Sequence, residues 1–300
     1  MSRPDLIVVG AGIIGVAAAL EIKRRHGLRI LVVEKEESPG LHASGRNSGA
    51  LHAGFYYSAD SLKARLCREG NLLWTAYCRE RSLPLLECGK LVVCRGPEDL
   101  STLDLLLDRG KNNGVPLERL SAAEARSIEP RVRTFEAALY SPSTATVDPL
   151  AVLSSLIEDS RRAGIEFMFG MRFHSLEQDG YSFIKDRQKI TINAPRFLNT
   201  AGLYADRIAH AFGYGLRYTI LPFKGIYLYA DPGPALACHI YPVPDLGQPF
   251  LGVHHTLTVD GRIKIGPTAI PAFWREQYDW RNPRFGELAA IARSEERRVG

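Results

Sequence analysis

The sequence predicts an α/β fold that combines a Rossmann-like domain with a second, discontinuous domain built on an antiparallel sheet. Two observations predict the first domain: an apolar run at 5–9 leads through a glycine-rich turn into a helix, and another apolar run follows at 29–33. A third predicts the second domain, because short strand-like segments alternate with Gly and Pro turns from 218 to 267. Helix–strand and strand-only regions alternate along the chain, so each domain is expected to consist of separate pieces.

Composition bounds the class of protein. The 300 residues are 45% hydrophobic and 24% charged, with a net charge of +5 and scattered Lys and Arg, which disfavours nucleic acid as a partner. The five cysteines have no CxxC spacing, so reduced thiols and no metal site are expected. No apolar run has membrane-spanning length and no leader pattern precedes the first strand. We therefore expect a cytoplasmic protein, either free or peripheral at the inner membrane face.

The remaining elements follow in order along the chain. Residues 41–57 are rich in Gly, Ser, Asn and His and are expected to be irregular. Ser121 and Glu124 have the spacing of a capping box that opens a helix. Further helices are expected at 60–82, 98–113 and 150–163, and strands at 89–95, 165–169 and 196–200. The expected first domain comprises 1–88 and 145–216, and the second comprises 89–144 and 217–290.

The last eight residues differ in character from the rest of the chain. Residues 293–300 read Arg-Ser-Glu-Glu-Arg-Arg-Val-Gly, and their first seven match the translation of a common sequencing-adapter sequence. We interpret 293–300 as a non-native tail on a C-terminally truncated chain. A charged helix end is the alternative interpretation.

The glycine-rich turn indicates a dinucleotide site. Gly10, Gly12 and Gly15 form a GxGxxG that directly follows the first strand and directly opens the first helix. Gly10 permits the turn, Gly12 lets a pyrophosphate approach the backbone, and Gly15 lets the helix pack close to the strand. The helix N-terminus offers free N–H groups to the phosphates. A glycine turn in another kind of α/β fold is the alternative.

Two further segments identify the dinucleotide. Glu34 ends the second strand, where its carboxylate can accept hydrogen bonds from a ribose and would repel a 2′-phosphate, which disfavours NADP. Residues 41–50 carry small side chains with hydroxyl and amide groups, which let the backbone run close to a bulky ligand such as FAD, whereas NAD enzymes usually have an ordinary helix there. A flexible surface loop is the alternative. Residues 198–202 end a later strand at a glycine turn that is expected to pass the cofactor. The expected FAD-binding residues are Gly10, Gly12, Ile13, Ile14, Gly15, Glu34, Lys35, Ser44, Arg46, Asn47, Ser48, Gly49, Ala201 and Gly202.

At this point the chain resembles the FAD-dependent oxidoreductases of the D-amino-acid oxidase superfamily, and within it the L-2-hydroxyglutarate oxidase/dehydrogenase family. The resemblance covers nearly all of 5–290, and three stretches carry it: His42 to Tyr57, Leu221 to Tyr227, and Ile240 to Pro267. It implies that the first domain binds FAD and the second binds substrate. Lys224 departs from the pattern, since many relatives have Arg there, and a lysine lacks the bidentate grip of Arg on a carboxylate.

The resemblance also implies a reaction. A 2-hydroxy acid, above all L-2-hydroxyglutarate, would be oxidised to the 2-oxo acid, here 2-oxoglutarate, by hydride transfer to flavin N5, with molecular oxygen or a membrane quinone as the electron acceptor. The alternatives are another flavin enzyme of the superfamily, such as an amino-acid oxidase or a glycerol-3-phosphate dehydrogenase, and an inactive truncated fragment.

The expected catalytic residues are His52, His254 and Lys224. A base of near-neutral pKa suits histidine, and His52 directly follows the segment expected along the flavin. His254 and His255 are adjacent on an expected strand, so at most one of them faces the site. A structural histidine is the alternative for each. Further cations and hydrogen-bond donors for a dicarboxylate are Arg46, Lys264, Tyr56, Tyr57 and Tyr241.

Overall fold

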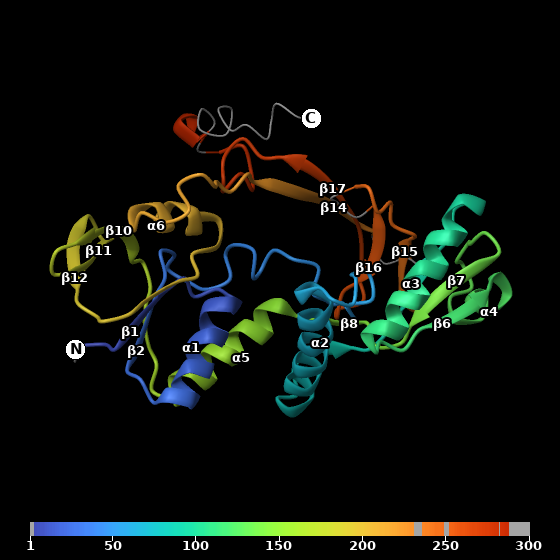
Figure 1. Ribbon diagram of the computed structural model, residues 1–300, viewed down its shortest axis with the longest axis horizontal. Helices are drawn as coiled ribbons and strands as arrows, with labels where there is room; N and C mark the ends of the chain where they lie inside the picture. The colour runs from blue at the N-terminus through green and yellow to red at the C-terminus, as the bar shows by residue number, and fades with distance from the viewer. Residues whose placement is uncertain (1–2, 231–235, 249–251, 282, 288–300) are drawn as a thin grey trace. The chain divides into compact units, whose positions relative to one another are not determined.

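The computed structural model describes residues 3–230, 236–248, 252–281 and 283–287 (Figure 1). The expected tail at 293–300 lies outside these residues. Contacts between residues divide the chain into two units. The first comprises Met1–Asn47, Pro149–Lys224 and Pro271–Gly300, and the second comprises Ser48–Asp148 and Gly225–Ile270.

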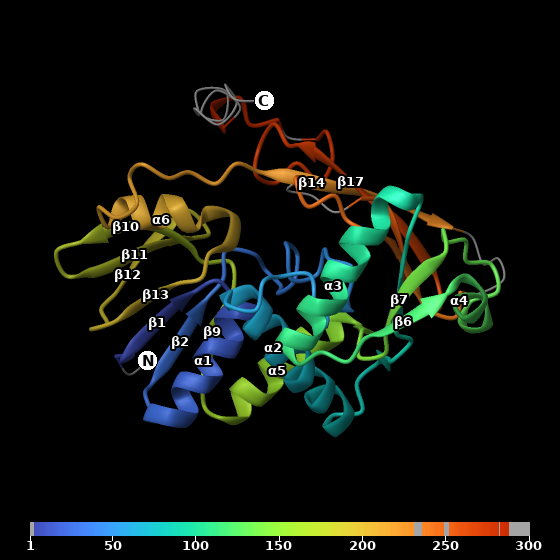
Figure 2. The same cartoon turned by 45° about the vertical axis from the view of Figure 1, so that its right-hand side comes forward.

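The first unit is built on a parallel sheet of order β13-β1-β2-β9 (Figure 2). Strands β1 (Leu6–Val9) and β2 (Ile30–Val33) are buried along their whole length, as expected for strands covered on both faces. Helix α1 (Ile13–His26) joins them and ends at Gly27, whose φ of 65° is the left-handed helix stop that favours glycine. Helix α5 (Pro149–Arg162) packs against α1. The other two strands are β9 (Glu166–Met168) and β13 (Phe197–Asn199).

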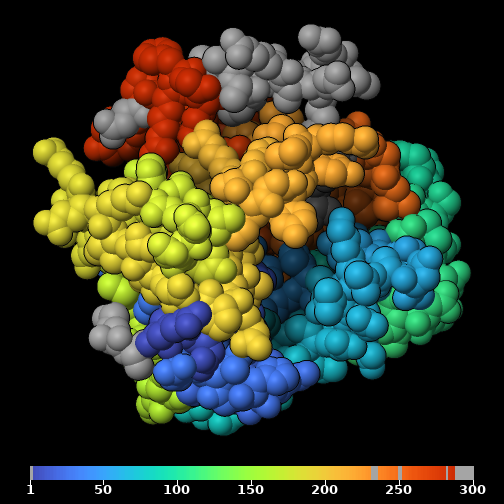
Figure 3. Space-filling view, turned by 60° about the vertical axis from the view of Figure 1, so that its left-hand side comes forward, coloured from blue at the N-terminus to red at the C-terminus, as the bar shows by residue number. Residues whose placement is uncertain are grey.

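A three-stranded antiparallel sheet completes this unit. Figure 3 shows it in yellow beside residues 205–220 in orange. Its strands are β10 (Arg172–Glu177), β11 (Gly180–Lys185) and β12 (Gln188–Ile192), and beside them lie η2 (Gly202–Tyr204) and α6 (Ala205–Ala211). Aromatic side chains of both sheets meet here: the ring of Phe173 lies 5.5 Å from that of Phe197, which lies 4.9 Å from that of Phe212. This aromatic packing joins the antiparallel sheet and α6 to the parallel sheet.

The second unit contains a seven-stranded sheet of order β14-β17-β16-β15-β5-β7-β6. The sequence predicts an antiparallel sheet, and the structure corrects this in one pairing, because β15 runs parallel to β5. The two strands are far apart in sequence, so no hairpin constrains their direction. The strands are β5 (Lys90–Val93), β6 (Glu118–Ser121), β7 (Ala137–Ser141), β14 (Phe223–Ala230), β15 (His239–Pro242), β16 (His254–Leu257) and β17 (Ile263–Pro271).

Helices and a small sheet complete the second unit. Helix α2 (Leu62–Glu80) begins after Ser61, whose hydroxyl accepts from Ala64 N. Helix α3 (Leu100–Asn113) follows the short η1 (Pro97–Asp99), and α4 (Ala122–Ile128) begins with the predicted capping box. The small sheet contains β3 (Ala50–Leu51), β8 (Ala145–Val147) and β4 (Leu85–Leu86).

Residues 48–88 lie with the second unit, whereas the sequence analysis assigns them to the first domain. Their contacts explain the grouping, since β3 and β4 both pair with β8, and the buried Asn71 amide donates to Leu51 O and Ser143 O. The expected domain boundaries stay a prediction. The five cysteines are all free. Across the described part of the chain, no helix has both the length and the apolarity of a membrane-spanning segment.

Candidate functional site

The glycine turn between β1 and α1 is closely packed. Gly10 has φ of 109°, and a Cβ added there would lie 2.4 Å from the carbonyl oxygen of Thr200. A Cβ on Gly15 would lie 2.0 Å from Gly10 O and 2.6 Å from the Thr200 hydroxyl. No side chain fits at either position, so the start of α1 lies directly against the ends of β1 and β13.

The N-terminus of α1 lies open beside this turn. Gly12 is the N-cap residue and supplies no side-chain cap. The hydroxyl of Ser44, from the irregular segment, accepts from Ile13 N at 2.9 Å, and it would lie 3.0 Å from a Cβ on Gly12. Free N–H groups and the positive end of a helix dipole at a backbone without side chains form a cradle that suits a pyrophosphate.

Glu34 lies at the end of β2 and faces the same turn. One carboxylate oxygen accepts from Ala11 N at 2.8 Å and the other from Glu36 N at 3.0 Å. These bonds fix the carboxylate beside the helix N-terminus while it stays half-buried. A carboxylate so placed can accept from the hydroxyls of a ribose whose phosphates lie on the helix.

A cavity of about 700 Å³ opens beside these groups. Its size falls within the range of about 300–1,000 Å³ that is usual for cofactor sites. Most of the expected FAD-binding residues line it: Gly10, Gly12, Ile13, Ile14, Glu34, Lys35, Ser44, Asn47, Ala201 and Gly202. Gly15 is not among the lining residues, because it acts in packing. Ser48 and Gly49 belong to the second unit. The residues present therefore fit the adenosine and pyrophosphate parts of a dinucleotide.

The irregular segment is held largely by its own side chains. Arg46 donates to Leu41 O at 2.7 Å, and its guanidinium lies 3.9 Å from the centre of the Tyr278 ring. The Asn47 amide donates to the carbonyls of Ala43 and Ser44. In this structure both residues shape the segment that lines the cavity.

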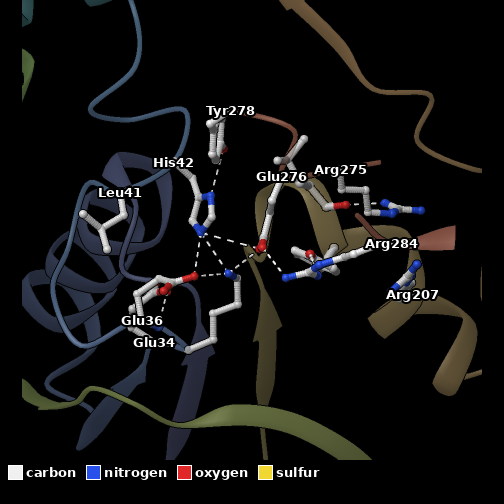
Figure 4. Close-up of polar contacts among 12 residues, drawn as sticks. Glu34, Glu36, Leu41, His42, Arg207, Arg275, Glu276, Tyr278 and Arg284 are labelled. Atoms are coloured by element: carbon white, nitrogen blue, oxygen red, sulfur yellow. Dashed lines mark hydrogen bonds and ion pairs between the residues drawn. The ribbon is translucent and has the colours of Figure 1, made fainter. Parts of the chain in front are cut away.

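Lys35 belongs to an ionic cluster that lines the cavity, together with Glu36, His42 and Glu276. Figure 4 shows the side chains of Glu36, His42 and Glu276 pointing toward one another. The Lys35 ammonium pairs with Glu36, lies 2.6 Å from Glu276 Oε1 and 2.8 Å from His42 Nε2. Burial favours the neutral form of each carboxyl, but the bonds to Lys35 outweigh it and hold the pKa values of Glu36 and Glu276 below their usual range. The acidic and imidazole groups lie close enough together to hold a metal ion, but Lys35 already supplies the positive charge between them.

Two residues after position 271 also line the cavity and belong to the first unit, whereas the sequence analysis places 217–290 in the second domain. Glu276 and Arg284 line the cavity and pair with each other at 2.6 Å. The segment is anchored by Arg275, whose guanidinium binds both oxygens of Asp206 at 2.7 and 2.8 Å with each side chain 8% exposed. No local pattern marks these residues, because each depends on a partner distant in the sequence.

The expected catalytic histidines lie in the second unit. His254 on β16 stacks on the Tyr241 ring at 3.8 Å, and the His52 ring meets the same tyrosine edge-on at 6.1 Å. His255 pairs with Ile240, so it points to the opposite face of the sheet from His254. His52, Tyr241 and His254 thus form one cluster.

Both histidines of this cluster are neutral at pH 7. Burial lowers the pKa of His52 to about 3 and that of His254 to about 4. For His52 the charge of Lys90 is the second cause. The Nδ1–H of His254 donates to Gly252 O at 2.8 Å, so in the neutral ring Nε2 carries the lone pair. Such a nitrogen can accept a proton.

The other expected side chains lie elsewhere. Lys224 belongs to the first unit, and its ammonium lies 5.2 Å from the centre of the Trp280 ring. Lys264 lies over the rings of Tyr227 and Tyr229. Tyr57 is exposed.

Two further buried residues, His239 and Lys90, lie beside Tyr241 and were not predicted. His239 Nδ1 accepts from Leu257 N at 3.0 Å and Nε2 lies 2.9 Å from the Thr146 hydroxyl, which fixes the neutral ring. Lys90 opens β5 and is fully buried. In the sequence, the position of this lysine at the start of the apolar run 90–93 could have indicated its burial.

Comparison with known proteins agrees with this geometry. Residues 5–297 match the DAO family, described as FAD dependent oxidoreductase. The chain is 37% identical over 306 residues to the mitochondrial L-2-hydroxyglutarate dehydrogenase of Nematostella vectensis, with 95% of this chain and 66% of that protein covered. It is 37% identical over 290 residues to the human mitochondrial L-2-hydroxyglutarate dehydrogenase, with 91% and 62% covered. The chain thus spans slightly less than two thirds of the length of these relatives.

A solved structure has the same fold. FAD-bound L-alpha-glycerophosphate oxidase from Mycoplasma pneumoniae matches with a TM-score of 0.78 at 23% identity, over 97% of this chain and 78% of that one. The expected superfamily and its cofactor, FAD, are confirmed by the family match. The chain belongs to the DAO family of FAD-dependent oxidoreductases.

Proposed function

We propose that this protein oxidises a 2-hydroxy acid, specifically L-2-hydroxyglutarate to 2-oxoglutarate, with FAD as the cofactor. The observation that carries the proposal is the 37% identity to L-2-hydroxyglutarate dehydrogenases over at least 290 residues. The glycine turn, Glu34 and the cavity beside them support it, because they fit the dinucleotide that the reaction requires. Oxidation of the substrate removes a hydride from C2 and a proton from the hydroxyl group.

The first unit holds the cofactor in this proposal. The N-terminus of α1 and the backbone of Gly12 bind the pyrophosphate, and Glu34 accepts from the ribose. When bound, FAD supplies the acceptor for the hydride that leaves C2.

The second unit supplies the base that takes the hydroxyl proton. A neutral imidazole is required, and both His52 and His254 are held neutral. The bond from His254 Nδ1 to Gly252 O favours proton transfer to Nε2. The proton goes to one of these two rings, while the hydride leaves C2 and the C2–O bond becomes the carbonyl of the 2-oxo acid.

The electrons then leave for molecular oxygen or a membrane quinone. A quinone acceptor would bring this otherwise cytoplasmic protein to the inner face of a membrane. Oxygen consumption during turnover, compared with the reduction of an added soluble quinone, distinguishes the two acceptors.

Anaerobic bleaching of bound FAD tests the proposal. The chain is saturated with FAD and offered L-2-hydroxyglutarate, its D-isomer, glycerol 3-phosphate and a set of amino acids. Bleaching by L-2-hydroxyglutarate alone is expected. A preparation that stays colourless after FAD addition, or one bleached only by an amino acid or by glycerol 3-phosphate, contradicts the proposal.

Matched histidine variants identify the base. His52→Ala and His254→Ala are compared with His255→Ala, because His255 lies on the same strand as His254 but points to the opposite face. Loss of the base should slow flavin reduction by about 10²–10⁴-fold with FAD still bound. Normal reduction in both His52→Ala and His254→Ala would remove these histidines from the mechanism.

A further inference from the structure

Lys90 is an ionisable residue buried in the interior of the second unit. It lies on β5, between β15 and β7 in the seven-stranded sheet, and no part of the residue is exposed. Among the residues that the structure describes, none accepts a hydrogen bond from its ammonium. An ammonium buried without an acceptor is costly, so the site favours a partner that the described residues do not supply.

Aromatic rings surround the ammonium. Lys90 Nζ lies 4.4, 4.6 and 4.8 Å from the ring centres of Tyr56, Phe55 and Tyr241, respectively. Cation–π contacts of this kind offset only part of the cost of burying the charge. Burial accordingly lowers the pKa of Lys90 to about 7.

A second hydrogen-bond donor beside Lys90 also lacks a partner. Within the described residues nothing binds the buried hydroxyl of Tyr56, the residue whose ring lies nearest to the ammonium. Tyr56 is half-buried whereas Phe55 and Tyr241 are buried, so Tyr56 is the most exposed residue of the three. Two donors without an acceptor are complementary to a group that only accepts, and a carboxylate is such a group.

The surroundings of Lys90 are otherwise neutral or weakly acidic. On the sheet face that carries it, His239 is its partner in register, and Tyr241 and His254 lie on the same face. The titratable groups that act on it or face it are Cys67 from α2, His52 and Tyr56 from the loop after β3, His239 and Tyr241 from β15, and His254 from β16. An anion that arrives here therefore meets one cation and the imidazoles expected to take the substrate proton.

We propose that Lys90 binds a carboxylate of the anionic substrate, with the Tyr56 hydroxyl donating to the same group. The proposal rests on the proposed function, since a 2-hydroxy dicarboxylate requires a cation near its reacting carbon. It assigns to Lys90 the role that the sequence analysis gave to Lys224, whose ammonium lies over the Trp280 ring in the first unit.

Binding of glutarate to the FAD-loaded chain tests this proposal. Glutarate is a dicarboxylate without the hydroxyl group, so it binds without reacting, and calorimetry reports its affinity. Lys90→Met should weaken binding by about 100-fold, because it removes a charge-assisted bond, and Lys90→Arg should restore part of the loss. Tyr56→Phe should weaken binding by about 5–10-fold. Lys63→Met is the matched control, since Lys63 lies over the Tyr57 ring at 5.7 Å but is exposed, and it should bind as the wild type does.

Proton uptake supplies a readout that a purely structural lysine would not change. At pH 8 the amine of the empty site is mostly neutral, and a bound carboxylate favours the ammonium, so binding should take up about one proton. The uptake is measured as the dependence of the binding enthalpy on the ionisation enthalpy of the buffer. It should shrink towards pH 6, where the lysine is already charged, and vanish in Lys90→Met.

The outcomes separate this proposal from the proposed function. Wild-type affinity for glutarate in a folded Lys90→Met protein overturns the role of Lys90, and so does a wild type that binds no glutarate or takes up no proton at pH 8. If Lys90→Met does not fold, the wild-type proton uptake and the Tyr56→Phe affinity decide. Glutarate binding that depends on Lys90, together with a flavin that L-2-hydroxyglutarate does not bleach, refutes the proposed reaction and leaves the carboxylate site standing.

Discussion

Replacing Asp206 by Asn should destabilise the first unit by about 3 kcal/mol. Burial alone would raise the pKa of Asp206, but the Arg275 guanidinium and the backbone N–H groups of Ile220 and Arg207 outweigh it and lower the pKa from 3.8 to about 2. This difference corresponds to about 2.5 kcal/mol in favour of the folded state at neutral pH. The variant also leaves Arg275 buried without a counter-charge, and such losses reach about 3–5 kcal/mol.

Urea unfolding followed by tryptophan fluorescence measures the effect. In a Trp74→Phe background the remaining tryptophans, Trp274 and Trp280, both belong to the first unit. Glu21→Gln is the control, because Glu21 pairs with Arg25 on the surface of α1, where an ion pair contributes little.

The difference in the free energy of unfolding between the wild type and Asp206→Asn should depend on pH. Because the folded pKa is below the unfolded one, the stabilisation is fully present above about pH 4 and is lost as the pH falls towards 2. A difference below 1 kcal/mol at pH 7, or one that does not shrink between pH 4 and pH 2, would refute the assignment of Asp206 and Arg275 as a stabilising buried pair.

Three further predictions follow from the site. Gly15→Ala should abolish FAD retention and lower the melting temperature, because its Cβ would lie 2.0 Å from Gly10 O; unchanged absorbance at the flavin band would contradict the packing. Glu34→Gln should weaken FAD binding by about 10-fold or more, as measured by fluorescence titration, since the amide accepts less strongly from Ala11 N and from a ribose; equal affinity would exclude a ribose contact. His239→Gln should make the stability of the second unit less dependent on pH between 6.5 and 4. A folded pKa of about 4 means that the stabilisation is fully present above pH 6.5 in the wild type and falls as His239 of the unfolded chain takes up a proton. Denaturant titrations at each pH give the free energy of unfolding, and an equal change of that free energy with pH in wild type and variant would refute this.

The sequence predicts best those parts of the site whose residues are neighbours along the chain. Gly10 and Gly15 lie in one turn, and the apolar runs on each side of α1 are buried throughout, so local pattern and tertiary structure agree. The capping box at Ser121 is likewise a local feature and forms as predicted. The alternation of side chains along a strand correctly separates His254 from His255, but the register with Ile240 decides which of them joins Tyr241.

Residues whose role depends on distant partners could not be predicted. Glu276 lines the cavity, and its neighbour Arg275 holds this segment in place by binding Asp206, which lies 69 residues away in the sequence. The parallel pairing of β15 with β5 is set by packing and not by a turn, and it brings His239 beside Lys90. The burial of Lys90 follows from that pairing, so the sequence alone shows a lysine at a strand end and not its isolation.

The division of both units into separate stretches of sequence constrains how the protein is made. Strand β1 ends at Val9 and its partner β13 begins at Phe197, so at 5–20 residues per second the ribosome exposes an unpaired apolar edge for roughly 10–40 s. Arg275 is synthesised later still, 69 residues after its partner Asp206. The nascent chain therefore passes through a long interval in which one edge of β1 lacks its partner, and the yield of folded protein should depend on translation speed and on chaperones that cover that edge.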